Sequence, residues 1–188
     1  LVGRMVEKGY DLEYAERIFK QIEGFGEYGF PESHAAGFAL LAYVSSWIKQ
    51  HHPDAFLCGL LNAQPMGFYA PAQLVRDARE HGVDVRAVDV AISDWESTLE
   101  GEPVAAKHGA VGALGEGLRQ AVRLGLNRVK GLAEDAGKRI VEARAAARFA
   151  SPEDLARRAR LDAHALAALA DAGALQSLSG HRHNAVCR

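Results

Sequence analysis

The first part of the chain carries apolar side chains at the three- and four-residue spacing of amphipathic helices. Residues 11–23 show this spacing most clearly, and Gly24 follows them as a helix stop. The pattern therefore predicts a helix that ends at Gly24. The apolar positions of this segment are Leu12, Ala15, Ile18, Phe19 and Ile22.

The next segment is apolar on every side. Residues 35–48 contain no charged residue, and a helix of this kind belongs in a protein core. We therefore expect residues 35–50 to form a buried central helix. Pro53 and Pro71 stand at positions suited to the first residue of two further helices, the second of which ends at Gly82.

The pattern changes between Val83 and Val129. Valine and leucine alternate with polar residues in 83–90, 95–101 and 121–129, which predicts three short strands. Residues 101–117 are rich in glycine and alanine and indicate a loop. From Lys130 onward the chain is helical again, and Ser151 and Pro152 supply the cap and first residue of one helix.

Composition narrows the class of protein. The 188 residues are 48% hydrophobic and 24% charged, which is typical of a globular protein, and no apolar run reaches the length of a membrane span. Cys58 and Cys187 are too few and too far apart for a disulfide framework, which indicates a reducing cytoplasm. Because the chain begins at Leu1 and lacks the pattern of a signal peptide, we expect a piece of a longer cytoplasmic protein.

The net charge of −2 conceals an uneven distribution. Residues 1–100 hold 8 Lys/Arg against 15 Asp/Glu, whereas residues 119–160 hold 11 against 5. A local excess of cations is typical of surfaces that meet phosphates. A solvated helix face rich in arginine would give the same count.

Residues 129–144, VKGLAEDAGKRIVEAR, join a glycine-containing turn to a helix. Backbone N–H groups at such a helix start can bind an anion such as a DNA phosphate. The segment resembles the helix-hairpin-helix motif, although Ala133 stands where that motif prefers glycine and Gly137 where it prefers alanine. A plain helical turn is the alternative. The residues predicted to contact DNA are Lys130, Gly131, Leu132, Ala133, Lys138 and Arg139.

A second, more degenerate unit occupies residues 154–175, with helices on either side of Leu161 and Asp162. A packing partner for the first unit explains it better than direct DNA contact, because neither unit is amphipathic enough to stand alone. The whole chain is thus predicted to be mainly α. A helical part covers 1–82, a short β connector with a Gly/Ala-rich loop covers 83–128, and a tandem helix-hairpin-helix domain covers 129–188.

Glycines precede the expected central helix at Gly24, Gly26 and Gly29, and Ser33 and His34 stand at its start. The positive end of the helix could bind a triphosphate or a template phosphate there. The alternative is that Ser33 only caps the helix and that His34 is a partly buried structural histidine.

Neither a metal site nor a catalytic residue is predicted in this chain. Asp84 and Asp89 do not form the carboxylate cluster that two-metal phosphoryl transfer needs. Two groups of histidine and cysteine lack the ligand spacing of zinc sites. They are His51, His52 and Cys58, and His181, His183 and Cys187.

Three long stretches, in this order, resemble the bacterial C-family DNA polymerases, the DNA polymerase III α-subunit family. They cover residues 25–69, 81–100 and 124–144. PESH at 31–34 and NAQPMGFY at 62–69 are similar to the error-prone, damage-tolerant members of that family. The resemblance implies that residues 1–82 are the late part of the polymerase fingers and that the catalytic palm lies outside this chain.

The resemblance also implies an activity and partners for the complete enzyme. It would be a DNA-directed DNA polymerase, a nucleotidyltransferase of damage-induced mutagenesis and translesion synthesis, whereas this chain alone would be inactive and hold no cofactor. Mg²⁺ and a deoxynucleoside triphosphate would serve the full-length enzyme, with the nucleotide near Ser33 and His34. Residues 130–133 would hold duplex DNA of any sequence, and accessory mutagenesis proteins would be further partners; no membrane is involved.

Two other interpretations stay open. The C-terminal half could be an autonomous DNA-binding module without sequence preference. Alternatively, the chain could be a structural brace or a docking surface for accessory proteins. Arginines of residues 119–160 that are dispersed or paired within the protein would favour the brace over a DNA grip.

Overall fold

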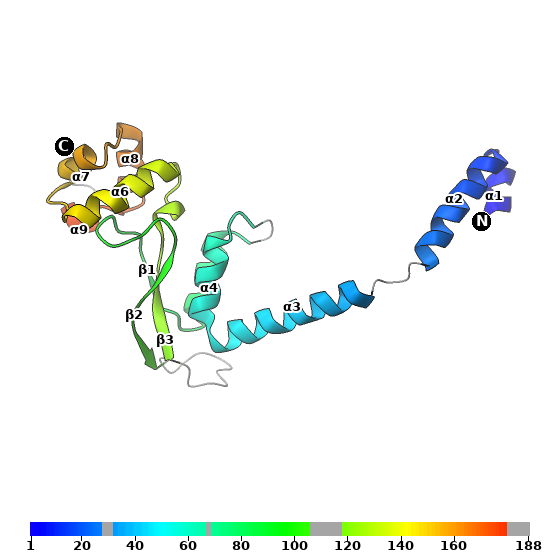
Figure 1. Ribbon diagram of the computed structural model, residues 1–188, viewed down its shortest axis with the longest axis horizontal. Helices are drawn as coiled ribbons and strands as arrows, with labels where there is room; N and C mark the ends of the chain where they lie inside the picture. The colour runs from blue at the N-terminus through cyan, green and yellow to red at the C-terminus, as the bar shows by residue number, and fades with distance from the viewer. Residues whose placement is uncertain (28–31, 67–68, 106–117, 180–188) are drawn as a thin grey trace. The chain divides into compact units, whose positions relative to one another are not determined.

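The computed structural model describes residues 1–27, 32–66, 69–105 and 118–179 (Figure 1). The chain divides into two compact units, Leu1–Ser46 and Trp47–Arg188. Helices dominate, and one small sheet lies in the second unit, so the predicted mainly α class is confirmed. None of the described helices has both the length and the apolar character needed to cross a membrane.

Some sequence predictions lie outside the described residues: Gly29, most of the predicted 101–117 loop, and the group His181, His183 and Cys187. The division of the chain at residues 82 and 128 stays a prediction.

The first unit contains α1 (Val2–Glu7), α2 (Leu12–Glu27) and most of α3 (Glu32–His51). The prediction that a helix ends at Gly24 is wrong, because α2 continues to Glu27. A glycine commonly ends a helix by adopting a left-handed conformation, which Gly24 does not do. Within a helix, glycine costs only about 1 kcal/mol relative to alanine.

Helix α3 is not the buried central helix that its lack of charge predicts. Its large apolar side chains are exposed, Tyr43 by 71%. An apolar pattern shows that a helix is suited to burial, but burial also needs a covering surface, which a sequence pattern does not reveal. The exposed side chains are Phe38, Leu40, Leu41, Tyr43, Val44 and Trp47.

The second unit holds one small sheet (Figure 1). It has three strands, and β3 lies between β1 and β2. The strands are β1 (Val85–Arg86), β2 (Thr98–Ala105) and β3 (Leu118–Arg123). β1 runs parallel to β3 and aligns Val85 with Val122, whereas β2 runs antiparallel to β3 and aligns Leu99 with Val122.

Helices α4 (Pro53–Asn62) and α5 (Pro71–Glu80) begin at the two prolines that the sequence marks, and Gly82 follows α5 with a positive φ of 80°. α4 packs on β2 and β3, α5 packs on α4, and the helices and strands share one apolar cluster. Its buried members are Leu57, Leu61, Ala78, Val83, Val85 and Val122.

Of the third predicted strand, 121–129, only the first three residues belong to β3. β3 ends at Arg123, and a one-turn 3-10 helix, η1 (Leu126–Arg128), follows it. Gly125, between the two elements, lies directly against a neighbouring loop, where an added Cβ would be 2.4 Å from the carbonyl carbon of Glu96. Leu126 and Val129, three residues apart, then enter the core that lies under the C-terminal helices.

The remaining helices are α6 (Glu134–Ala146), α7 (Pro152–Arg158), α8 (Ala163–Asp171) and α9 (Gln176–Ser179). The predicted cap of α7 is confirmed, since the Ser151 hydroxyl accepts a hydrogen bond from the Asp154 amide at 3.2 Å. The core under these helices includes Val88 and Val90 from the connector. Its other large buried members are Leu126, Ile140, Leu155, Leu169 and Leu175.

Candidate nucleic-acid interface

The predicted DNA-contacting segment forms a tight turn before α6. The Leu132 amide donates a hydrogen bond to the Val129 carbonyl at 3.2 Å, which closes a four-residue turn. Gly131, the third residue of that turn, has a φ of 87°, as a type II turn requires. Val129 and Leu132 are buried and anchor the turn, whereas Lys130 and Gly131 are exposed at its tip.

The start of α6 has no side-chain cap. Ala133 is the N-cap residue, and the first helical hydrogen bond runs from the Gly137 amide to the Ala133 carbonyl at 3.1 Å. The amides of Gly131, Ala133 and residues 134–136 have no acceptor within the described part of the chain. Free N–H groups at a helix start favour an anion.

Acidic side chains oppose this effect in the first turn of α6. Glu134 and Asp135 both lie there and are exposed. Glu134 pairs with Lys138 at 2.7 Å, and the hydrogen bond between them raises the pKa of Lys138. A phosphate at this helix end would therefore compete with a carboxylate for Lys138.

Arg139 lies on the side of α6 that faces the second helical unit. Its Nε donates to the Ala159 carbonyl at 2.8 Å, and Nη2 donates to the Arg160 carbonyl at 3.3 Å. Its guanidinium is therefore engaged by the protein's own backbone. Lys130, by contrast, makes no hydrogen bond or ion pair within the described residues.

Most cations of the basic segment 119–160 are paired within the protein. Eight of its eleven Lys/Arg side chains hydrogen-bond to carbonyls, amides or carboxylates of the described chain. These are Arg119, Arg123, Arg128, Lys138, Arg139, Arg144, Arg157 and Arg158. Lys130, Arg148 and Arg160 make no such contact with described residues. The charge excess is thus largely structural, which favours bracing for those eight residues.

The second hairpin joins α7 to α8 and differs from the first. The Leu161 amide donates to the Ala156 carbonyl at 2.9 Å, and Arg160 has a φ of 52° where a glycine is usual. Asp162 caps α8 by accepting a hydrogen bond from the Ala165 amide at 2.8 Å. The Asp162 carboxylate therefore occupies this helix end and takes up the Ala165 amide, whereas the start of α6 has no side-chain cap.

The two hairpins lie against each other. Besides the Arg139 contacts, the imidazole of His164 in α8 lies beside Gly131, where an added Cβ would be 3.3 Å from its Nε2. His164 is exposed and was not predicted from the sequence. Only the packing of the second hairpin on the first brings it there, so no local pattern could have identified it.

The other predicted site residues lie in α3. His34 is exposed in the first turn of that helix, and its ring meets Phe38 edge to face at a centroid distance of 4.5 Å. The side chain of Ser33 lies outside the described residues. The proximity of these two residues to a nucleotide stays a prediction.

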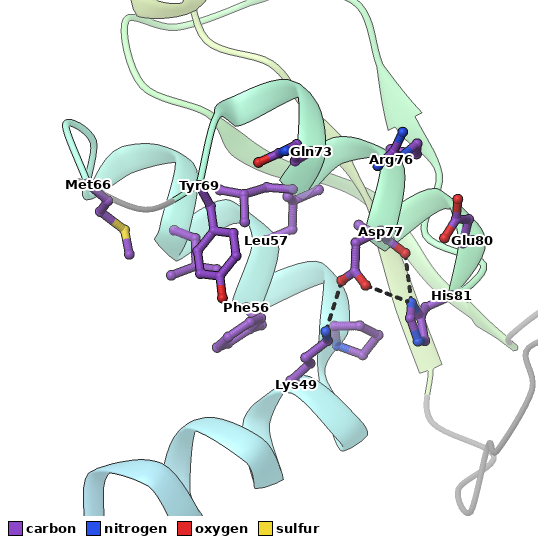
Figure 2. A pocket seen from close by; sticks show the side chains of 14 residues that line it. Lys49, Phe56, Leu57, Met66, Tyr69, Gln73, Arg76, Asp77, Glu80 and His81 are labelled. Carbon is purple, nitrogen blue, oxygen red and sulfur yellow. Dashed lines mark hydrogen bonds and ion pairs between the residues drawn. The ribbon is translucent and has the colours of Figure 1, made fainter. Parts of the chain in front are cut away.

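A groove of about 640 Å³ lies between α4, α5 and the end of α3 (Figure 2). Phe56, Leu57 and Tyr69 line its apolar part. At its polar end, Asp77 pairs with Lys49 at 3.0 Å, and Nδ1 of His81 lies 3.6 Å from the Asp77 carboxylate. Lys49 and Asp77 thus neutralise each other, while the charged side chains of Arg76 and Glu80 also line the groove.

His51, His52 and Cys58 do not form a ligand set. The Cys58 thiol donates to the Ser97 carbonyl at 3.1 Å, and burial raises its pKa, which disfavours the thiolate. Within the described residues, no three His, Cys, Asp or Glu side chains are grouped so that they could hold a metal ion.

Comparison with known proteins identifies the hairpin region. The model of the family described as "Helix-hairpin-helix motif" matches residues 82–185, more than half of the chain. The chain belongs to this helix-hairpin-helix family. The match includes both the connector and the two hairpins, so the motif seen at residues 129–144 is part of a longer helix-hairpin-helix region.

This helix-hairpin-helix chain is also similar to curated proteins named "Error-prone DNA polymerase". It is 59% identical over 181 residues to the one from Azoarcus sp. (strain BH72), covering 96% of this chain and 16% of that protein. It is 58% identical over 182 residues to the one from Bordetella parapertussis, covering 97% and 16%, and 56% identical over 186 residues to that of Burkholderia mallei, covering 99% and 17%. The predicted resemblance is confirmed, and the chain spans 16–17% of the length of these relatives.

Proposed function

We propose that the chain is a DNA-gripping part of an error-prone DNA polymerase, a nucleotidyltransferase that performs translesion synthesis in the bacterial cytoplasm. Relatives of that name match nearly the whole chain, and its C-terminal region belongs to the helix-hairpin-helix family. The observation that carries the proposal is the first hairpin, where exposed Lys130 and unpaired amides meet at one tip. Such a tip binds a phosphodiester without reading base sequence.

The proposed contact is local rather than a broad basic face. Gly131 and Ala133 present backbone, Leu132 anchors the turn from the core, and Lys130 supplies the free charge. Lys138 is exposed and can exchange its carboxylate partner for a phosphate, because surface ion pairs are weak. Arg139 acts as a positioning residue that joins the hairpins. With two carboxylates nearby, binding by this chain alone is expected to be weak.

Fluorescence anisotropy with two duplexes of unrelated sequence tests this proposal. The chain should bind both equally, and its affinity should fall as salt rises, with a shallow slope because few cations meet the phosphates. Lys130→Ala should weaken both complexes alike and lower the slope of log affinity against log salt by about one. Lys20→Ala, at an exposed position of α2, is the matched control and should leave binding unchanged. Salt-independent binding, or a preference for one sequence, would contradict a phosphate grip.

For the complete polymerase, we propose that Ser33 and His34 border the incoming deoxynucleoside triphosphate. Support comes from the PESH stretch and from the exposed position of His34 at the start of α3. His34→Ala in the complete polymerase should raise the KM for nucleotide without changing affinity for duplex DNA. A change in DNA affinity with an unchanged KM would reject this assignment.

The Mg²⁺ expected for the complete polymerase does not fit the residues described here, since these contain no suitable group of ligands. The proposal assigns the metal and the catalytic carboxylates to other parts of the polypeptide. The chain alone is accordingly expected to be inactive in templated nucleotide addition.

A second candidate function, a packing or docking surface, is favoured by α3. Its apolar side chains are exposed on a chain that spans about one sixth of its relatives, so other parts of the polypeptide or an accessory protein could cover them. Leu41→Gln with Tyr43→Gln should reduce binding of a hydrophobic dye to this chain. The same pair should destabilise the complete polymerase if the surface is covered there, and leave it unchanged if it is not.

A further inference from the structure

The second hairpin unit contributes one side chain to the tip of the first hairpin. An added Cβ at Gly131 would lie 3.3 Å from Nε2 and 3.8 Å from Cε1 of His164, so the edge of the imidazole faces the tip. His164 belongs to α8, more than thirty residues further along the chain. Arg139, hydrogen-bonded to two carbonyls of the second hairpin, keeps the two hairpins together.

His164 has the chemistry of a phosphate ligand at this position. Its side chain is exposed, and its ring nitrogens make no hydrogen bond to any described residue. An imidazole always carries at least one N–H donor, and a protonated one adds a positive charge. The ring therefore brings a donor beside Gly131, the residue that follows Lys130, from an element that the first hairpin itself does not include.

We propose that His164 binds the same DNA phosphodiester as Lys130, so that one phosphate site is built from both hairpin units. The inference rests on the proposed function, because it assigns a further binding residue to the same hairpin. It also gives the second hairpin a part in DNA contact, although Asp162 caps the start of α8.

The alternative is that His164 only fills space beside Gly131. A space-filling histidine would affect folding rather than affinity, and a lysine in its place would not restore binding. If His164 is a phosphate ligand, its removal should lower affinity rather than disturb folding, and a lysine in its place should restore binding.

Anisotropy with a labelled duplex and the intact 188-residue chain separates these alternatives. His164→Ala should lower affinity about fivefold to tenfold, a typical effect of removing one hydrogen bond. His164→Lys should restore or exceed the original affinity and steepen the salt slope by about one. His52→Ala, at an exposed histidine outside the two hairpins, is the control and should bind as the unchanged chain does.

Thermal melts establish that the variants are folded. If His164→Ala loses its melting transition, His164→Gln and His164→Lys decide, since both keep a long polar side chain. Weaker binding by the glutamine variant than by the lysine variant supports the proposal. Equal binding by those two, or unchanged binding by a folded His164→Ala, overturns it.

Lys130→Ala in the same experiment separates a failure of the proposed function from a failure of the His164 assignment. If Lys130→Ala binds as tightly as the unchanged chain, the proposed function fails, and the His164 assignment falls with it. If Lys130→Ala weakens binding while His164→Ala does not, only the His164 assignment is wrong. In the double variant, losses smaller than the sum of the single effects are expected when both side chains bind one phosphate.

Discussion

The indole of Trp95 occupies the space that a side chain at residue 137 would need. A Cβ added to Gly137 would lie 2.3 Å from Cε3 and 2.6 Å from Cζ3 of that ring, distances that no packed atoms adopt. This explains why the chain has glycine where the helix-hairpin-helix motif prefers alanine. Glycine is a poorer helix former than alanine, but at residue 137 it allows α6 to pack closely against Trp95 of the connector.

Gly137→Ala should destabilise the second unit despite the higher helix propensity of alanine. Overpacking of a filled core costs about 1–3 kcal/mol, whereas the propensity gain is at most about 1 kcal/mol. Urea unfolding measures the balance. The matched control is Gly59→Ala in α4, where an added Cβ meets nothing within 4 Å and alanine should stabilise by about 0.5–1 kcal/mol. An equal increase in the free energy of unfolding for both variants would show that the Trp95 ring can move aside at little cost.

Arg160→Gly should stabilise the fold. A non-glycine residue in the left-handed conformation costs about 1–2 kcal/mol, and Arg160 has a φ of 52° at an exposed position. Thermal unfolding should therefore move to a higher temperature. Arg157→Gly, three residues earlier within α7, should move it lower, because glycine is unfavourable in a helix interior. A lower melting temperature for both variants would mean that the Arg160 side chain makes a stabilising contact.

Arg158 should matter more for stability than its neighbour Arg157. Its guanidinium donates to the carbonyls of Ala143, Ala147 and Arg148 near the end of α6, and it lies 4.9 Å from the centroid of the Phe149 ring. Arg158→Met removes the guanidinium donor from these carbonyls, of which Ala143 keeps the Ala147 amide as a donor, and we expect a loss of about 1.5–3 kcal/mol in urea unfolding.

The matched control is Arg157→Met. The Arg157 side chain is 78% exposed and pairs with Asp154 at 2.7 Å on the surface, so its removal should change the free energy of unfolding by less than about 1 kcal/mol. Comparable losses for both arginines would contradict the capping role of Arg158.

Glu100 links the sheet to acid stability. Its hydrogen bond from Arg123 is the main cause that holds the pKa of Glu100 below the usual 4.5, and Arg86 adds to it. A lowered carboxyl pKa stabilises the folded state above the unfolded-state value, and that contribution is lost as pH falls through the folded-state value. The free energy of unfolding should therefore decline below about pH 4.5. Glu100→Gln should flatten this decline, whereas Glu102→Gln, at an exposed position of the same strand, should not.

Local signals in the sequence identified the elements well. Prolines at 53, 71 and 152 begin helices, Ser151 caps one, and Gly131 forms the predicted turn. These features depend on residues within one or two turns of each other. The turn after β3 was missed because Gly125 is packed against a loop about thirty residues earlier in the chain, and spacing within 121–129 cannot show that contact.

Long-range pairing explains what else the sequence could not reveal. A count of cations predicted a basic surface, but the carbonyls that Arg139 and Arg158 bind carry no mark in the sequence. His164 became a candidate only because the two hairpins pack together. The same limit applies to α3, whose composition tells how apolar it is but not what covers it.

The central position of β3 decides how the molecule can be dissected. Cutting before residue 119 would remove both neighbours of that strand, together with Val88 and Val90 from beneath the helices. A fragment made in that way would be insoluble or unfolded, and its failure to retain DNA would say nothing about the hairpins. The shortest piece suited to binding studies therefore starts at Trp47, with the sheet and its two covering helices left intact.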